Sequence, residues 1–217
     1  MSKRELTGRY IIFMIGLFIN SFGVTFITKA SLGTSPISSI PYTLSLGFKP
    51  TLGIFTLYMN ILLIVIQIIL LKKDFPKYYF LQIPVSIVFS YFIDFTMNLM
   101  SFMVLDTYFI KLICLIIGCV ILGLGVYFEI VADVIMLPGE LFVKSLALTL
   151  DKDFGKIKIA FDVSLTIIAG IVGFVLFHKL AGIGEGTIIA ALLVGFTARL
   201  LKRKLVFFEN LLLKYTI

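Results

Sequence analysis

Six long apolar runs divide this chain, and they constrain its fold more than any other feature of the sequence. Each run approaches or exceeds the ~20 apolar residues that an α-helix needs to cross the hydrocarbon core of a bilayer. Backbone N–H and C=O groups find no partners in lipid, so such runs must be helical. The sequence therefore predicts an all-α integral membrane protein with six transmembrane helices, formed by residues 10–28, 51–71, 79–104, 107–131, 156–177 and 183–201.

The composition excludes a soluble protein. Hydrophobic residues make up 60% of the 217 residues and charged residues only 14%, whereas a soluble domain of this size must cover itself with polar groups. The net charge of +7 does not indicate nucleic-acid binding, because Lys and Arg cluster near the ends of the apolar runs, where they orient a membrane protein. We therefore predict membrane lipid as the surroundings and no nucleic-acid partner.

Residues that carry enzyme or metal chemistry are sparse. His178 is the only histidine, and Cys114 and Cys119 lie five residues apart inside one apolar run, which matches neither a zinc pattern nor a disulfide framework. The glycines of residues 182–187 are not followed by the Lys–Ser/Thr pair of a phosphate-binding loop. We expect no catalytic residue, no metal site and no bound cofactor, and we predict that the protein is not an enzyme.

Lys and Arg are distributed unequally between the two sides of the membrane that six spans define. With a cytoplasmic N-terminus, fifteen of the 19 basic residues lie on the cytoplasmic side, and only Lys29, Lys49, Lys111 and Lys179 lie outside. Cytoplasmic loops of membrane proteins carry an excess of Lys and Arg. The sequence therefore predicts that both termini are cytoplasmic.

An internal repeat divides the chain into two halves. At a constant offset of 102 residues, glycines and a proline coincide: Gly16 with Gly118, Gly23 with Gly125, Pro36 with Pro138 and Gly53 with Gly155. Coincident Leu or Ile would be common in a membrane protein, but coincident Gly and Pro are not. We interpret the pattern as a duplication within one membrane domain, with repeats at residues 1–104 and 105–204 and an apolar tail at 205–217.

Each repeat contains three spans and one short segment that begins at a proline. The short segments, predicted as helices at residues 35–47 and 138–150, cannot cross a bilayer. Three spans reverse the side on which the second repeat begins, so the two repeats are predicted to be inverted relative to each other. Inverted repeats with broken helices indicate an alternating-access transporter with a midplane site; the alternative is a structural duplication in a protein that does not transport.

The first short segment offers a site for a negative group. Ser35 and Pro36 match the N-cap and first position of a helix, whose free N–H groups and positive dipole end suit a carboxylate or phosphate. Ser38 adds a hydroxyl group. The alternative is plain capping, in which the serine side chains bind their own helix.

The second short segment carries an acid. Pro138 and Gly139 break the apolar run, and Glu140 follows in the first turn, where an ionisable group inside a membrane protein indicates function. We interpret Glu140 as a group that binds a proton, a sodium ion or a substrate amine. The alternatives are that Glu140 only complements the helix dipole, or that it pairs with Lys144.

Three further polar positions are candidates for substrate or ion binding. Asp162 aligns with Asn60 and lies inside a predicted span, where a charge costs ~2.5–3.5 kcal/mol, so we expect it to face the protein interior. Asp94 shares one helical face with Tyr91 and Asn98. Two other acids, Glu129 and Asp133, fall near the inner membrane boundary, where contact with water is sufficient to explain them.

Four segments of the chain resemble the YczE/YyaS/YitT family of bacterial membrane proteins: KASLGTSP, GxxxLYMN, GLGVYFEIVADVIMLPGE and GIGEGTIIAALLVGF. The resemblance covers residues 9–204 and implies a multi-pass protein of the bacterial cytoplasmic (inner) membrane. In that family an acidic residue commonly follows the proline by two in both repeats. Here Glu140 matches the second position, and Ser38 replaces the acid in the first.

We predict a secondary transporter or exporter of a small polar solute, anionic or zwitterionic, that works by alternating access with a coupling proton or sodium ion. The alternative function is a non-enzymatic substrate-binding or accessory membrane subunit of a larger transport complex. A homodimer is compatible with the glycines at 16, 23, 118 and 125, which allow close helix packing between copies or equally within one chain.

Overall fold

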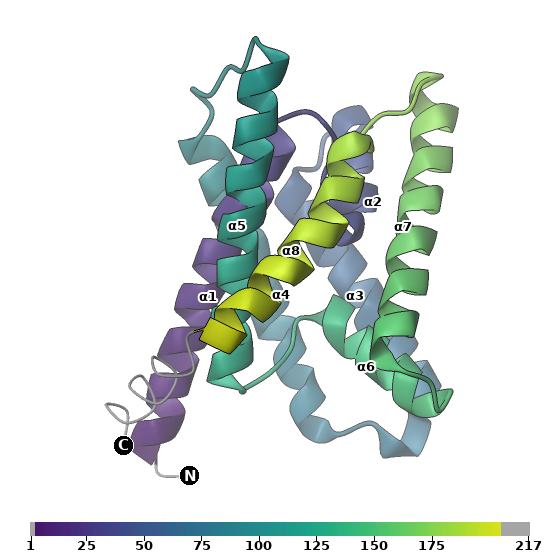
Figure 1. The fold of residues 1–217 in the computed structure, drawn as a ribbon. Helices are drawn as coiled ribbons and strands as arrows, with labels where there is room; N and C mark the ends of the chain where they lie inside the picture. The colour runs from purple at the N-terminus through teal and green to yellow at the C-terminus, as the bar shows by residue number, and fades with distance from the viewer. Residues whose placement is uncertain (1–2, 205–217) are drawn as a thin grey trace.

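The structure is a computed structural model that describes residues 3–204, and no strand occurs in this part of the chain. The prediction of an all-α protein is confirmed, and the predicted tail at 205–217 lies outside the described residues. The elements follow one another as α1 (Lys3–Lys29), α2 (Pro36–Gly47), α3 (Leu52–Leu71), η1 (Lys72–Asp74), η2 (Lys77–Leu81), α4 (Gln82–Leu99), α5 (Tyr108–Ala132), α6 (Pro138–Thr149), α7 (Phe154–Phe177) and α8 (Glu185–Lys204) (Figure 1).

Five of the six predicted spans are confirmed as helices long and apolar enough to cross a membrane. They are Arg4–Lys29, Leu52–Asp74, Lys77–Leu99, Tyr108–Ala132 and Phe154–Phe177. The sixth, α8, has 20 residues but carries Glu185 in its first turn and Lys202, Arg203 and Lys204 in its last. These charges leave no stretch of α8 as apolar as the other spans, so the sixth span stays a prediction.

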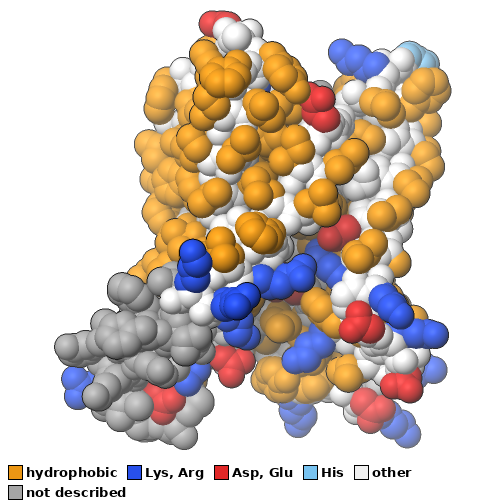
Figure 2. Space-filling view, in the orientation of Figure 1, with side chains coloured by type: hydrophobic (Ala, Val, Ile, Leu, Met, Phe, Trp, Pro, Cys, Tyr) orange, Lys and Arg blue, Asp and Glu red, His pale blue; other side chains and the backbone are white. Residues whose placement is uncertain are grey.

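The exterior of the molecule is apolar, and its interior contains polar side chains. Ile11, Ile69 and Ile171 are 55%, 65% and 60% exposed, whereas Gln67 and Thr96 are fully buried. On the face drawn in Figure 2, hydrophobic side chains cover the upper part and most Lys and Arg side chains lie below them. Apolar surface on this scale is solvated by lipid and not by water, so the chain is a multi-pass membrane protein.

The two short helices begin at their prolines. Pro36 and Pro138 are the first residues of α2 and α6, where a missing N–H group costs nothing because the first helical N–H groups have no partner in the helix. Each helix has 12 residues and is therefore about 18 Å long, well short of a bilayer. In Figure 1, α2 lies in the upper half of the molecule and α6 in the lower half.

The predicted boundaries differ most at the third span. Residues 79–104 were expected to form one helix, but η2 occupies the start and α4 runs only from Gln82 to Leu99. Pro84 explains the first difference, since a proline is tolerated in the first turn of an α-helix but not in its interior. The short helices differ from their predicted ranges, 35–47 and 138–150, by one residue each.

Helix packing crosses between the two halves of the chain. Helix α1 lies along α5, and each of them contacts a further helix, α4 and α8 respectively. Each short helix packs against a long helix of the other half, α2 against α7 and α6 against α3. The interior therefore brings together two pairs of consecutive helices that are distant in the sequence, α2 with α3 and α6 with α7.

Glycines allow the close approach of α1 and α5 within one chain. A Cβ atom on Gly23 would lie 2.5 Å from the backbone of Leu122, and one on Gly125 would lie 2.6 Å from the Asn20 nitrogen. Gly16 and Gly118 face the same contact. The four glycines thus serve packing inside the chain. They therefore give no support to the predicted homodimer.

We expect Gly23→Ala to destabilise this contact. The added methyl group would meet the backbone of Leu122, which cannot move alone, and overpacking of this kind costs ~1–3 kcal/mol. The melting temperature in detergent should fall by roughly 2–12 °C for a chain of this size. Gly195→Ala is the matched control, because its Cβ would find only Arg199 Nη2, at 3.9 Å. Equal melting temperatures for both variants would contradict the assignment.

The two halves differ in one contact. Helices α3 and α4 pack side by side, whereas α7 stands apart from α8 (Figure 1). The start of α3 is held by α4 so closely that a Cβ on Gly53 would overlap the Ser90 carbonyl group and the Asp94 side chain. Gly155, which aligns with Gly53, would meet only Asp153 Oδ1, at 3.1 Å, so the start of α7 has no such neighbour.

Candidate substrate and ion site

The N-termini of α2 and α6 meet inside the molecule. The Ile37 side chain lies directly over Gly139, where a Cβ atom would overlap Ile37 Cδ1. Both residues are in the first turn of their helices. The positive dipole ends of two separate helices therefore face one region, and the predicted residues Pro36, Pro138 and Gly139 lie together there.

The turn between α7 and α8 holds α2 in this position. Thr43 Oγ1 on α2 donates to the carbonyl oxygen of Ala181 in the turn at 3.1 Å. Gly186 N, in the first turn of α8, donates at 2.8 Å to the carbonyl oxygen of Leu32, which precedes α2. Gly182 has φ +80° and lies against Thr43, where a Cβ would overlap the threonine hydroxyl group. The glycine-rich segment at 182–187 thus serves as a tight turn that docks on α2.

Two buried glutamines hold α6 in a comparable way. Gln67 Nε2 on α3 donates to the Pro138 carbonyl oxygen at 3.2 Å. The side-chain amides of Gln67 and Gln82 also donate to each other, both at 3.3 Å, and both side chains are fully buried. Sequence reasoning missed this pair; the signal was two glutamines inside apolar runs, where an uncharged amide needs an internal partner.

The serines at the start of α2 bind mainly within their own segment, and Ser39 Oγ also reaches the Leu165 carbonyl oxygen of α7 at 3.4 Å. Ser35 Oγ donates to Ser38 Oγ at 3.0 Å, and Ser39 Oγ donates to the Pro36 carbonyl oxygen at 2.6 Å. All three serines are buried. Ser38 Oγ accepts in this arrangement, so its own proton is left to donate to a bound negative group.

Glu140 lies in the first turn of α6 and is half-buried. Within residues 3–204 it forms no hydrogen bond or ion pair, and Lys144, the alternative partner, is exposed. Its neighbours act through charge: Lys158 attracts the carboxylate, and Asp162 and Glu129 repel it. Glu140 is thus a carboxylate near the molecular interior whose oxygen atoms are available to a ligand.

Asp162 faces the same group of charges. Lys158 Nζ donates to Asp162 Oδ1 at 2.7 Å, and the two side chains are 31% and 18% exposed. Asn60, the residue aligned with Asp162, is 5% exposed on α3, and its Nδ2 atom has no hydrogen-bond partner in the part of the chain that the structure describes. A buried amide left unpaired costs ~1–3 kcal/mol, which favours a ligand as its partner.

Asp94 lies apart from Glu140 and caps α3. Asp94 Oδ2 accepts from Thr51 Oγ1 at 2.6 Å, and Oδ1 accepts from Gly53 N at 2.8 Å. Gly53 and Gln67, the residue that touches α6, are separated by about 20 Å along α3. Tyr91 and Asn98, which were expected to join Asp94, are exposed. The geometry therefore gives Asp94 a role at the contact between α3 and α4.

Glu129 is a buried acid that sequence reasoning treated as solvated. It lies on α5 and is only 5% exposed. Asn20 Nδ2 on α1 donates to Glu129 Oε1 at 2.7 Å, whereas Oε2 has no partner among the described residues 3–204. Asp133, by contrast, ends α5 in the left-handed conformation at φ 47° and is exposed. The available signal was one asparagine and one glutamate, each inside an apolar run, in two runs that correspond to each other in the repeat.

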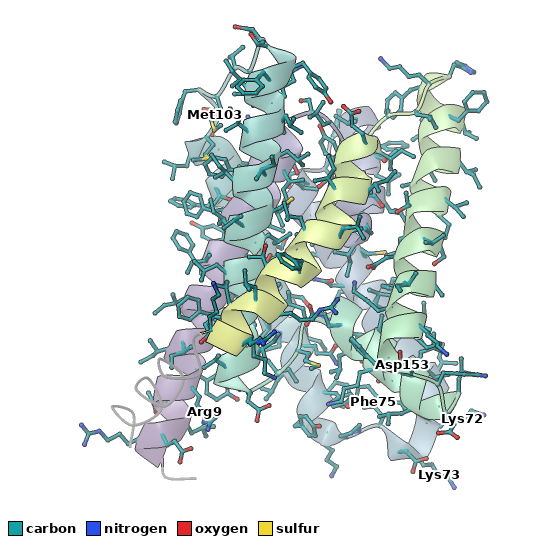
Figure 3. All side chains as sticks on the ribbon, viewed as in Figure 1. Arg9, Lys72, Lys73, Phe75, Met103 and Asp153 are labelled. Atoms are coloured by element: carbon teal, nitrogen blue, oxygen red, sulfur yellow. The ribbon has the colours of Figure 1, made fainter. Side chains whose placement is uncertain are left out.

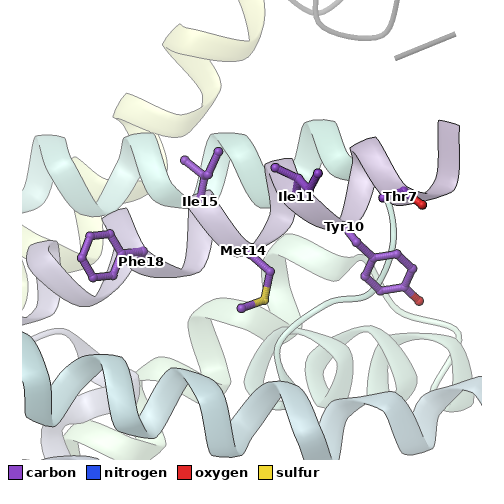
Figure 4. A pocket seen from close by; sticks show the side chains of 6 residues that line it. All are labelled: Thr7, Tyr10, Ile11, Met14, Ile15 and Phe18. Carbon is purple, nitrogen blue, oxygen red and sulfur yellow. The ribbon is translucent and has the colours of Figure 1, made fainter. Parts of the chain in front are cut away.

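The surface of α1 carries no comparable chemistry. A hollow on α1 is lined by one face of that helix: Thr7, Tyr10, Ile11, Met14, Ile15 and Phe18 (Figure 4). Its apolar, outward-facing lining fits lipid chains. Among residues 3–204, no group of three or more His, Cys, Asp or Glu side chains is arranged to hold a metal ion.

Comparison with known proteins gives a family but no activity. The model of a family described as "Family of unknown function (DUF6198)" matches residues 7–203. A protein of Bacillus subtilis (strain 168) with the name "Uncharacterized protein YyaS" is 28% identical over 122 residues, which cover 54% of this chain and 57% of that protein. The alignment thus spans little more than half of the relative. Both findings confirm the resemblance seen in the sequence, and no solved structure matches.

Proposed function

Because this chain belongs to the DUF6198 family of unknown function, we propose from its own geometry that it is a secondary transporter. It would move a small anionic or zwitterionic solute across the bacterial cytoplasmic membrane by alternating access. One observation carries the proposal: the N-termini of two half-helices, α2 and α6, meet in the interior beside the Glu140 carboxylate, which has no hydrogen-bond partner among residues 3–204. Broken helices that aim their N-termini at a central site are typical of such transporters.

The inverted-repeat interpretation is part of the proposal. Helices α6 and α7 begin 102 residues after α2 and α3, the offset at which the sequence repeats. If α2 corresponds to α6 and α3 to α7, the contact between α2 and α7 is equivalent to the contact between α6 and α3. With α8 as the sixth span, residues 1–104 and 105–204 would enter the membrane from opposite sides.

The distribution of charge supports a cytoplasmic start of the chain. Figure 3 places Arg9, Lys72 and Lys73 at the lower end of the molecule and Met103 at the opposite end. Most basic side chains on the face shown in Figure 2 also lie at the lower end. Under the positive-inside rule this end is cytoplasmic.

Glu140 and Glu129 form the proposed ion site. Glu140 is close enough to Glu129 to act on it electrostatically. Glu129 is only 5% exposed, and its Oε2 atom has no partner within residues 3–204. A bound proton or sodium ion would give this buried oxygen atom a partner. The negative group of the solute would lie at the start of α2, where Ser38 and the helix dipole favour an anion.

The unequal contacts of α3 and α7 support an inward-facing arrangement. Asp94 closes α4 onto the start of α3 at the proposed outer end. The start of α7, at the proposed inner end, has no equivalent contact with α8. In the opposite state, α7 would approach α8 while α3 leaves α4.

The proposal is tested by solute flux into proteoliposomes that contain the purified full-length chain. We expect uptake of at least one solute from a panel of small carboxylates, phosphates and amino acids when an inward proton or sodium gradient is imposed. Empty liposomes and dissipation of the gradient with an ionophore are the controls. Uptake no faster than in empty liposomes across the whole panel would contradict the proposal.

A further inference from the structure

A second hollow lies at the end of the molecule opposite Lys72 and Lys73. It has a volume of about 590 Å³ and is lined by three lysines from three separate segments: Lys29 at the end of α1, Lys49 between α2 and α3, and Lys111 in the first turns of α5. Met103, labelled in Figure 3, lines the same hollow and marks its position.

The hollow concentrates positive charge. No Asp or Glu lines it, and none of its three lysines forms an ion pair within residues 3–204. Two acids lie beside it in the sequence or structure. Both oxygens of Asp94 already accept from Thr51 and Gly53, and Asp106, which follows the lining residue Leu105, is exposed. Like charges that converge on a hollow repel one another and raise the local concentration of anions.

The same lysines are exceptions to the charge distribution of the chain. Only four of the 19 basic residues fall on the predicted outer side, and three of them line this one hollow. Basic residues are disfavoured in outer loops, so their convergence from three segments needs an explanation. A bound negative group provides one.

The lysines are the donors that an anion would find. Four of the five hydroxyl groups in the lining are engaged: Thr51 Oγ1 donates to Asp94, Ser31 Oγ to the Lys29 carbonyl oxygen, Ser45 Oγ to the Tyr42 carbonyl oxygen, and Thr28 Oγ1 shares a hydrogen bond with Thr34 Oγ1. The Tyr42 hydroxyl group is the remaining one and can add a donor to those of the lysines. A lysine ammonium group offers three donors and binds phosphate or carboxylate as a point charge. Recognition would therefore depend on charge more than on shape.

We propose that this hollow is an outer vestibule that binds the phosphate or carboxylate group of the transported solute before it enters the central site. This inference rests on the proposed transport function. It restricts the transported solute to molecules that carry a phosphate or carboxylate group. Thr51 belongs both to the hollow and to the Asp94 contact. An anion in the vestibule therefore lies next to the contact that must open.

The test is a lysine footprint on the full-length protein in nanodiscs of neutral phosphatidylcholine. The rate at which an amine-reactive acetylating reagent modifies each lysine is measured by peptide mass spectrometry, with inorganic phosphate as the probe. We expect phosphate to slow modification of Lys29, Lys49 and Lys111, about tenfold at ten times the Kd. Lys179, the outer lysine outside the hollow, should react at an unchanged rate.

Lysine variants and changes of lipid composition test whether the three lysines bind free phosphate together. Lys49→Gln should weaken the protection of Lys29 and Lys111, whereas Lys179→Gln should leave it unchanged. Absence of protection by phosphate would overturn the proposal. So would protection that appears only in nanodiscs containing phosphatidylglycerol, because the hollow would then hold a lipid headgroup. The footprint requires no flux, so failure of the vestibule and failure of transport are observed separately.

Discussion

Glu140→Gln is expected to abolish gradient-driven uptake while leaving the protein folded. Glutamine keeps the size of the side chain but removes the charge that would bind a proton or sodium ion at the start of α6. Hydrogen bonds to charged groups contribute ~1.5–3 kcal/mol. Without a bound proton or sodium ion, the ion gradient can no longer drive uptake of the solute. We expect the initial rate of gradient-driven uptake to fall by about 100-fold, a loss equivalent to ~2.8 kcal/mol.

Two further measurements distinguish a loss of ion coupling from a general loss of activity. Exchange of labelled solute without a gradient should persist in Glu140→Gln, since the start of α2 is unchanged. Glu185→Gln is the matched control, because Glu185 is also an acid in the first turn of a helix, α8, but lies outside the site. Gradient-driven uptake that survives in Glu140→Gln at the rate of Glu185→Gln would exclude Glu140 as the coupling group.

Asp94→Ala is expected to open the outer end of the molecule. The Asp94 carboxylate accepts from Thr51 Oγ1 at 2.6 Å and from Gly53 N at 2.8 Å, and these bonds join α4 to the start of α3. A hydrogen bond to a charged group contributes ~1.5–3 kcal/mol, and 1.4 kcal/mol corresponds to a tenfold change in an equilibrium. We therefore expect the outward-facing population to rise about 10- to 100-fold.

A cysteine at the centre of the molecule reports this shift. Ser38→Cys is introduced after Cys114 and Cys119 are replaced by alanine, and its reaction with a membrane-impermeant maleimide is followed from each side. Asp94→Ala should accelerate labelling from outside and slow labelling from inside. Asp106→Asn, an exposed acid between α4 and α5, is the control. Acceleration from both sides would indicate unfolding, and no change would exclude Asp94 as a gate.

The helices could be predicted from the sequence because their signals are local. A run of apolar residues has one satisfactory structure in lipid, and a proline marks where a helix can begin. The short helices accordingly begin at Pro36 and Pro138, within one residue of their predicted starts. The exception is α8, where the basic residues that mark the end of a span also reduce its apolar character.

The candidate site could be predicted only in part. The repeat identified Pro36, Ser38, Pro138 and Glu140, and the contact of Ile37 with Gly139 brings the two segments together. Sequence position indicated that Asp94 was a binding residue and that Glu129 was solvated. Whether an acid in an apolar helix contacts another helix, water or a ligand depends on the direction it faces, and periodicity alone does not specify that direction.

Composition and local sequence signals were sufficient to predict a membrane protein, most of its helices and the two breaks at Pro36 and Pro138. Which polar groups meet depends on helix packing: Asn20 bonds to Glu129 across 109 residues, and Thr51 to Asp94 across 43. The physical reason is the range of the interactions. Helix formation in lipid depends on backbone hydrogen bonds within one segment, whereas a buried side chain takes its partner from whichever distant helix packs against it.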